Sequence, residues 1–258
     1  MILRGRTLWL IGASSGIGEA LAPALAREGA ILALSARRED ELHRVSAMCS
    51  TDARPIVKPL DVTDKAQVDR VYSELVEVWG KVDVLFYNAA ASAHTRVDEF
   101  DTEAALHQID VVYLGLVRAA GAVLPDMLSR HGGDIVATGS VAGYAGFPRA
   151  SAYSSAKSAV IAFLQALRIE LKGQGVGVVT VNPGFVKTAL TEENKFPMPF
   201  LLTSEQAAAA IVKGLLAGDE EIHFPKRLSW PVKLATALPR PVFERLARLM
   251  VRGDGRGG

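Results

Sequence analysis

The clearest candidates for chemistry are Tyr153 and Lys157, which stand four positions apart in the segment Tyr153-Ser154-Ser155-Ala156-Lys157. Residues at this spacing lie on the same face of a helix. A phenol has a pKa of about 10, too high for a base at neutral pH, and a nearby ammonium group lowers that pKa. We therefore expect the pair to exchange a proton with a substrate, although an isolated pair of this kind is more often an ordinary surface Tyr and Lys.

A third candidate, Ser140, follows the apolar run that ends in Thr138-Gly139. We predict a strand there, and a serine at the carboxyl end of such a strand faces the crevice where doubly wound folds bind ligands. From that position Ser140 is expected to donate a hydrogen bond to the same substrate oxygen that Tyr153 protonates.

A glycine-rich turn near the N-terminus predicts a phosphate-binding site. The apolar run from Leu8 to Ile11 leads into a G-x-x-x-G-x-G segment, a spacing that differs from the common dinucleotide fingerprint and from the P-loop. Glycine lets the backbone approach a ligand, and the helix predicted to follow presents free N–H groups to a pyrophosphate. Taken alone, the segment is also compatible with a plain strand-to-helix turn. The residues expected to bind the cofactor here are Gly12, Ser14, Ser15, Gly16, Ile17 and Gly18.

The elements that must hold these residues alternate along the chain. Apolar strands are predicted near 7–12, 30–36, 55–61, 82–88, 133–139, 176–182 and 221–224, and amphipathic helices near 16–28, 39–49, 64–79, 103–130, 152–172 and 204–217. This alternation predicts an α/β fold with a doubly wound parallel sheet of about seven strands and helices on both faces. We assign 1–225 to one dinucleotide-binding and catalytic domain, 226–252 to a helical extension and 253–258 to a flexible tail.

The composition narrows the classes of function. Apolar residues make up 49% of the 258 residues, and a net charge of +1 gives no argument for nucleic acid. Cys49 is the only cysteine, which excludes an internal disulfide and fits a reducing compartment. The histidines lack the spacing of metal ligands, so no metal site is expected. The first strand begins too early to leave room for a signal peptide, and a cytoplasmic protein is expected.

Together these motifs resemble the short-chain dehydrogenase/reductase family. The matching motifs, which stand in the family's order and at its intervals, are Gly12-x-x-x-Gly16-x-Gly18, Asn88-Ala89-Ala90, Ser140, Tyr153-x-x-x-Lys157 and Asn182-Pro183-Gly184. The resemblance covers roughly residues 5 to 224 and implies a single Rossmann-type domain. It also implies a reaction in which hydride moves between a nicotinamide cofactor and an alcohol or carbonyl.

The resemblance implies roles for individual residues. Tyr153 is the acid and base, Lys157 lowers the pKa of Tyr153 and binds the nicotinamide ribose, and Ser140 positions the carbonyl. Asp61, which precedes Val62, contacts the adenine, or alternatively belongs to a helix-capping turn. The other cofactor-binding residues implied are Val62, Asn88, Tyr153, Lys157, Pro183, Gly184, Val186 and Thr188, of which Thr188 is also compatible with an ordinary polar loop residue.

The second predicted strand ends in Ser35-Ala36-Arg37-Arg38, with no acid before Glu39. An acid at this place accepts a hydrogen bond from the ribose 2′-hydroxyl and repels a 2′-phosphate. Arg37 instead offers a planar fork that suits a phosphate. NADP(H) is therefore favoured over NAD(H), unless the two arginines merely solvate a loop.

Three positions depart from the family pattern. Ile11 stands where a threonine usually tethers the glycine turn, and Ala90 replaces a glycine. Val112 falls where an asparagine usually holds a water in the proton relay to the lysine. Valine cannot bind that water, so a backbone carbonyl replaces the side chain or turnover is slowed.

Residues 226–252 hold seven basic side chains and one acidic one, interleaved with apolar residues. This pattern predicts two short basic amphipathic helices. They either pack over the substrate site or a subunit interface, which we favour, or make a weak peripheral contact with an anionic membrane.

We therefore expect an NADP(H)-dependent oxidoreductase that interconverts a carbonyl and an alcohol. An apolar substrate is favoured because the irregular stretch 184–203, a predicted lid, carries Phe185, Leu190, Phe196, Met198, Phe200, Leu201 and Leu202. One alternative is a nucleotide-binding sensor or scaffold with weak or no catalysis, and another is an epimerase or dehydratase that keeps its cofactor bound. A homodimer or homotetramer is expected through the helices near 103–130 and 152–172.

Overall fold

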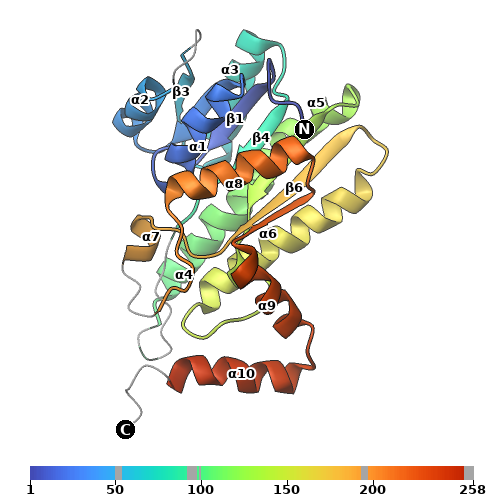
Figure 1. Cartoon of the computed structure of the whole chain (residues 1–258). Helices are drawn as coiled ribbons and strands as arrows, with labels where there is room; N and C mark the ends of the chain where they lie inside the picture. Colours follow the sequence, from blue (N-terminus) through green and yellow to red (C-terminus); the bar gives the residue numbers. More distant parts are fainter. Residues whose placement is uncertain (50–53, 92–97, 99, 193–196, 253–258) are drawn as a thin grey trace.

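The computed structural model describes residues 1–49, 54–91, 98, 100–192 and 197–252. Seven parallel strands form one sheet in the order β3-β2-β1-β4-β5-β6-β7. This arrangement confirms the predicted α/β fold with a doubly wound parallel sheet (Figure 1). The strands are β1 (Thr7–Ile11), β2 (Ile31–Ala36), β3 (Ile56–Pro59), β4 (Val84–Tyr87), β5 (Gly133–Thr138), β6 (Val176–Pro183) and β7 (Glu221–Phe224).

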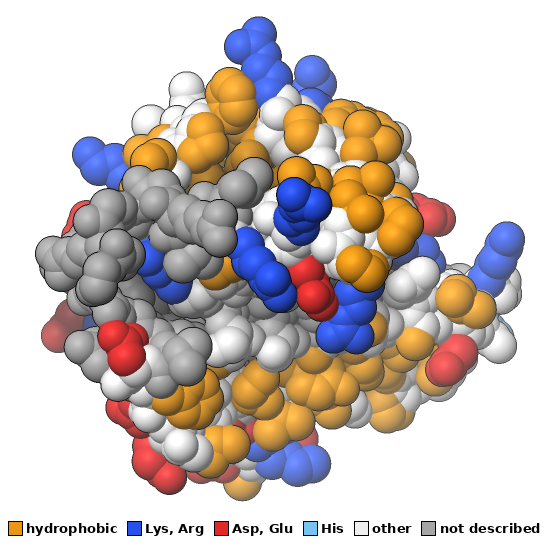
Figure 2. Space-filling model, turned by 90° about the horizontal axis from the view of Figure 1, so that it is seen from below, with side chains coloured by type: hydrophobic (Ala, Val, Ile, Leu, Met, Phe, Trp, Pro, Cys, Tyr) orange, Lys and Arg blue, Asp and Glu red, His pale blue; other side chains and the backbone are white. Residues whose placement is uncertain are grey.

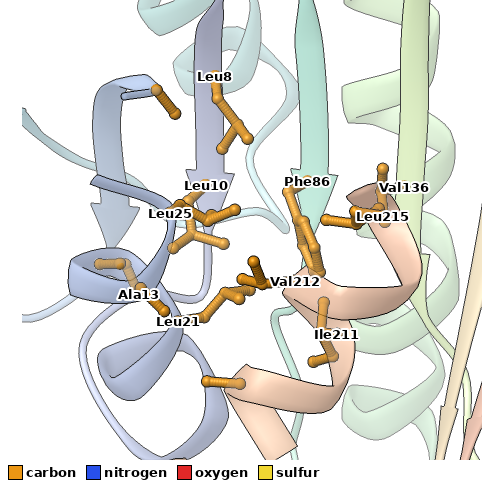
Figure 3. Packing of buried hydrophobic residues seen from close by; sticks show 14 of the residues in the cluster. Leu8, Leu10, Ala13, Leu21, Leu25, Phe86, Val136, Ile211, Val212 and Leu215 are labelled. Atoms are coloured by element: carbon orange, nitrogen blue, oxygen red, sulfur yellow. The ribbon is translucent and has the colours of Figure 1, made fainter. Parts of the chain in front are cut away.

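Helices cover both faces of the sheet, each burying one apolar stripe against the strands. On one face lie α1 (Gly16–Arg27), α2 (Glu39–Ala47) and α8 (Ser204–Ala217), whose leucines, isoleucine and valines meet those of the strands (Figure 3). The opposite face is covered by α3 (Lys65–Trp79), α5 (Gly115–Ser129) and α6 (Ser151–Glu170). Short helices η3 (Val141–Gly143) and α7 (Ala189–Glu192) lie in the connections.

The sequence of β1 explains why both faces need a cover. All of its residues are buried, and successive side chains of a strand point to opposite faces. Leu8 and Leu10 accordingly join the cluster under α1 and α8, while Trp9 and Ile11 join the cluster under α3, α5 and α6. A continuous apolar run of this kind is typical of a parallel strand that is buried on both sides.

The strand register brings four chain segments to one edge of the sheet. Ile11 at the end of β1 pairs with Tyr87, and Tyr87 at the end of β4 pairs with Ala137. Thr138 at the end of β5 pairs with Val181 in β6. The residues that follow these strand ends, which include most of the predicted site, are therefore neighbours in space.

The long helix predicted near 103–130 has a discontinuity that the sequence pattern did not reveal. It consists of α4 (Thr102–Ile109), a π-helical turn η2 (Asp110–Leu114) and α5. The Tyr87 hydroxyl donates a hydrogen bond of 2.5 Å to the Val111 carbonyl in this turn. Gly115 follows because a Cβ there would lie 2.2 Å from the Tyr87 hydroxyl oxygen.

By length and composition the segment Thr102–Ser129 could also cross a membrane, because an 18-residue window within it has a mean hydropathy of 1.5. In this fold it contributes Val112, Leu116 and Val123 to the apolar cluster beneath the sheet. A core helix of an α/β domain satisfies the same length and composition.

The chain beyond β7 forms the two helices that the basic amphipathic pattern predicts. They are α9 (Lys226–Thr236) and α10 (Arg240–Arg252). Figure 1 shows them below the sheet, with α10 the outermost element of the molecule. The predicted tail 253–258 lies outside the described residues.

The Tyr87→Phe variant tests how much the π-helical turn depends on this hydroxyl. Tyr87 is 2% exposed, so removal of its hydroxyl leaves the Val111 carbonyl without its donor. We expect the free energy of unfolding to fall by about 1 to 3 kcal/mol, measured by urea denaturation. Tyr113→Phe is the matched control. The Tyr113 ring packs edge-to-face against Phe163, and this ring contact does not need the hydroxyl. Equal stabilities of the two variants would contradict a special role for Tyr87.

Candidate active site

The glycine turn is shaped by two close approaches of backbone to backbone. Gly12 has a φ of +85°, and a Cβ on it would lie 2.5 Å from the Ala89 nitrogen. A Cβ on Gly18 would lie 2.0 Å from the Gly12 carbonyl oxygen. Gly16 has a φ of +57°, which a residue with a side chain rarely adopts. Each of the three glycines is therefore required by local geometry.

Asn88 ties this turn to the centre of the sheet. Its side-chain nitrogen donates to the Gly12 carbonyl at 3.1 Å, and its side-chain oxygen accepts from the Thr138 hydroxyl at 2.9 Å. Its backbone nitrogen donates to the Ile11 carbonyl at 2.8 Å. Asn88 therefore tethers the turn to β4 and β5 without a hydroxyl at Ile11.

The start of α1 is open for an anion. Ser15 is the N-cap residue, and among the described residues its side chain makes no capping hydrogen bond. The first backbone N–H groups of a helix have no partner within the helix, and together with its dipole they favour a phosphate. Ser14 and Ile17 stand in the same segment as Ser15, and their contact with a cofactor stays a prediction.

Arg38, which the sequence argument left aside in favour of Arg37, is the arginine that reaches the glycine turn. Its guanidinium donates to the Ser14 hydroxyl at 3.2 Å, and both Arg37 and Arg38 are exposed. Consecutive residues at a strand end point in different directions, so the sequence alone does not choose between them.

Asp61 stands in a turn just before α3, whose N-cap residue is Asp64 and not Asp61. Its carboxylate accepts from the Thr63 backbone nitrogen at 2.9 Å and from the Thr63 hydroxyl at 2.7 Å. Burial alone would raise the pKa of Asp61, but these hydrogen bonds outweigh burial and hold that pKa below its ordinary value. The neighbouring Val62 is buried and lies against Gly115.

Ser140, Tyr153 and Lys157 come together beyond the end of β5. Ser140 precedes η3, where its hydroxyl oxygen accepts from the Ala142 nitrogen at 3.1 Å. Tyr153 and Lys157 lie in the first turns of α6, and the Lys157 ammonium is 5.9 Å from the centre of the Tyr153 ring. Lys157 is only 2% exposed and donates to the Thr138 carbonyl at 2.7 Å.

The electrostatics of this group differ from the expectation that Lys157 lowers the pKa of Tyr153. Burial raises the pKa of Tyr153, and a hydrogen bond with Ser140 offsets only part of this effect, so the pKa lies above its ordinary value. Burial also lowers the pKa of Lys157 to about 8. Tyr153 is therefore a neutral phenol at neutral pH, which is the form that donates a proton.

The end of β6 lies next to this group and to the glycine turn. The Ser140 hydroxyl is 3.5 Å from the Pro183 carbonyl oxygen, and the Gly184 nitrogen donates to the Phe224 carbonyl at 2.7 Å. Val186 is buried. A Cβ on Gly16 would lie 2.9 Å from the Thr188 methyl carbon, so Thr188 sits directly against the glycine turn.

Val112 lies in the π-helical turn and is 1% exposed, packed in the cluster that contains Ala156 and Val160 of α6. An apolar side chain therefore occupies the place of the usual asparagine, as the sequence indicated. Ala90, which stands where the family usually has a glycine, is exposed.

A polar network beside the site was not anticipated from the sequence. Glu221 in β7 accepts hydrogen bonds from the Tyr144 hydroxyl at 2.8 Å, the Asn182 side chain at 2.9 Å and the Lys233 ammonium at 2.6 Å. Burial alone would raise the pKa of Glu221, but the donors outweigh burial and lower it. The network joins β6, β7 and α9 to the segment between Ser140 and Tyr153. Of its members, only Asn182 stands in a motif that the sequence analysis identified, Asn182-Pro183-Gly184.

Comparison with known proteins agrees with this geometry. A family model for short chain dehydrogenases matches residues 6–197. A Myxococcus xanthus protein described as an oxidoreductase is 37% identical over 94% of this chain and 96% of its own length. Mouse dehydrogenase/reductase SDR family member 7 is 37% identical over 74% of this chain and 60% of its own length.

Solved structures show the same fold. A short chain dehydrogenase from Burkholderia cenocepacia in complex with NADP has a TM-score of 0.81 at 24% identity, covering 96% of this chain and 99% of that one. A short chain dehydrogenase/reductase from Burkholderia phymatum in complex with NAD has a TM-score of 0.81 at 25% identity, covering 91% and 94%. The chain belongs to the short-chain dehydrogenase family, and it is an oxidoreductase.

The buried Lys157 gives a testable pH dependence. Its pKa in the folded protein, about 8, lies below the unfolded value of 10.5, so the unfolded state binds more protons between these values. Stability therefore rises with pH in this window. Relative to Lys157→Met, wild type should gain about 1.5 kcal/mol between pH 8 and about pH 9.5, measured by urea denaturation without nucleotide. Lys213→Met, at an exposed position of α8, should show no such difference, and a flat profile for Lys157→Met against wild type would refute the assignment.

Proposed function

We propose that the protein is an NADPH-dependent reductase that converts an apolar ketone or aldehyde to an alcohol. The observation that carries the proposal is the grouping of Ser140, Tyr153 and Lys157 at the sheet edge that also carries the glycine turn. A protein that only binds nucleotide has no need of a proton donor, a hydroxyl and a buried ammonium together.

The residues present fit a nicotinamide dinucleotide. Gly12 and Gly18 form a cradle that a Cβ would fill, and the open start of α1 suits the pyrophosphate. Arg38, held against Ser14, and the exposed Arg37 suit a 2′-phosphate. The expected contacts of Asp61, Val62, Asn88, Pro183, Gly184, Val186 and Thr188 are part of this proposal. When bound, the reduced nicotinamide supplies the hydride.

The chain's own residues then handle the substrate oxygen. Ser140 donates a hydrogen bond that orients the carbonyl, and Tyr153 gives up its phenolic proton as the carbonyl carbon becomes an alcohol carbon. Tyr153 is protonated at neutral pH and is therefore in the form that donates a proton. Lys157 supplies positive charge beside the phenolate that remains and binds the nicotinamide ribose.

The predicted lid supports an apolar substrate. Among its described residues, Leu190, Phe200 and Leu201 are 40%, 50% and 42% exposed. Phe196 lies outside the described residues. Few fixed charges stand in this stretch to bind an acidic substrate.

We also propose self-association through the helices α4, α5 and α6. Exposed apolar side chains on them include Leu106 at 58%, Leu128 at 38% and Ile169 at 71%. A cytoplasmic location is proposed with it, from the single free cysteine, which is buried.

A second candidate is a nucleotide sensor of the same fold, favoured by the apolar Val112 at the relay position. Both candidates bind NADPH, but only the reductase turns over a substrate.

The first test is Tyr153→Phe in an assay of NADPH oxidation with a panel of apolar ketones and aldehydes. The variant keeps the ring and loses the proton donor, so kcat should fall at least about 100-fold with NADPH affinity retained. Tyr113→Phe, the matched control, should keep wild-type activity. Tight NADPH binding without turnover by either wild type or variant would favour the sensor, and product formed without net NADPH consumption would indicate an epimerase or dehydratase.

Cofactor preference is tested by Arg37→Glu and Arg38→Glu. Loss of a charge-assisted hydrogen bond to a phosphate is expected to raise the KM for NADPH at least about tenfold, with little change in the KM for NADH. Lys65→Glu, at an exposed position on α3, is the control. An unchanged ratio of the two KM values in both arginine variants would contradict the NADPH preference.

A further inference from the structure

Helix α9 leaves a row of large apolar side chains uncovered. Trp230 and Leu234 stand four residues apart and are 54% and 67% exposed, and Leu238, after the helix, is 40% exposed. Residues at this spacing share one helical face. Exposed apolar side chains are common singly, but a continuous row is typical of an interaction site.

Helix α10 continues this pattern with two distinct rows. Phe243 and Ala247 form its inner row: Ala247 is buried, and the Phe243 ring meets Phe147 edge-on at 6.0 Å. Val242 and Leu246 form the outer row and are 46% and 45% exposed. The inner row accounts for the packing of α10 on the protein, so the outer row has a different role.

Basic side chains flank the exposed apolar row of α9, which is its outer row, and the outer row of α10. Arg227, Arg245 and Arg248 are exposed, and no carboxylate in the described part of the chain pairs with them. Glu244, the single acid of this region, is bound to Arg240 at 2.9 Å. Figure 2, which views the molecule from below, shows hydrophobic and basic side chains mixed on one face.

The surface is held firmly through its inner side. Lys233 forms an ion pair of 2.6 Å with Glu221 and lies 5.7 Å from the Trp230 ring centre. The His223 ring nitrogen and the Ser229 hydroxyl are 2.7 Å apart, and Ser229 donates to the Pro225 carbonyl. His223 therefore donates from Nδ1 and accepts from Lys226 at Nε2, which fits a neutral imidazole.

We propose that the outer rows of α9 and α10 form a docking surface for membranes that contain anionic lipid. An amphipathic helix with basic residues beside its apolar face binds in the interface of such a membrane. Tryptophan is enriched at this depth, and each nearby arginine is attracted by the negative surface.

Charge argues against the other occupants. A second copy on a two-fold axis would bring the same patch, and hence the same arginines, together. A nucleic acid would use the arginines but would leave Leu234, Val242 and Leu246 without an apolar partner.

The surface also lies close to the active site. Phe147, the partner of Phe243, stands in the segment between Ser140 and Tyr153. If the substrate is apolar, as the proposed function has it, docking would place this segment beside the lipid in which the substrate dissolves. Lipid binding itself does not depend on that function.

Flotation of the full chain with vesicles tests the proposal. The protein should float with vesicles of phosphatidylcholine and phosphatidylglycerol, much less with phosphatidylcholine alone, and less at high salt. Arg245→Glu with Arg248→Glu should lower partitioning at least about tenfold, and Leu234→Ser with Leu246→Ser should lower it as well. Lys172→Glu with Lys213→Glu, exposed positions elsewhere, should leave it unchanged, with folding of every variant checked by thermal unfolding.

Three outcomes would overturn the proposal. The first is no flotation with anionic vesicles, or flotation that the control variant loses to the same degree. The second is a wild-type oligomer, seen by light scattering, that the leucine variant alone converts to monomer, because a second copy then covers the surface. The third is tighter binding to duplex DNA than to vesicles, lost in the arginine variant. NADPH oxidation measured without vesicles reports separately on the proposed reductase.

Discussion

The hydrogen bonds of Asn88 are the constraint on which the site depends. One side chain spans the end of β1, through the Gly12 carbonyl, and the end of β5, through the Thr138 hydroxyl. The Thr138 carbonyl in turn receives the Lys157 ammonium. The phosphate-binding turn and the proton-transfer group are therefore parts of one hydrogen-bonded unit. Its dimensions are set by the spacing of parallel strands.

Much of the fold was predictable from the sequence because its determinants are local and repetitive. The apolar run from Leu8 to Ile11 and the regular alternation of strands and helices predict a parallel sheet with two covered faces, and all seven strands lie where the pattern indicated. The glycines of the turn and the four-residue spacing of Tyr153 and Lys157 were equally visible. Each of these features is defined by residues close together in the chain.

The features that escaped prediction depend on contacts between distant residues. The π-helical turn is stabilised by Tyr87, which lies on another element. The contact of Arg38 with Ser14 depends on side-chain direction just beyond the end of β2. The Glu221 network joins residues that are far apart in sequence, and no local pattern distinguishes Glu221 from an ordinary strand-end acid. The pKa of Tyr153 is raised and not lowered as expected, because burial, which spacing does not reveal, outweighs the hydrogen bond with Ser140.

The contact between Tyr87 and Gly115 links the sizes of two residues on different elements. The Tyr87 hydroxyl fills the space that any Cβ at position 115 would need. A side chain at 115 therefore requires a shorter side chain at 87, and Val62 must shift as well, because its Cγ2 would lie 3.0 Å from the new Cβ. Changes at the two positions are then non-additive. The tolerance of a helix position to substitution is thus set by a residue on a strand.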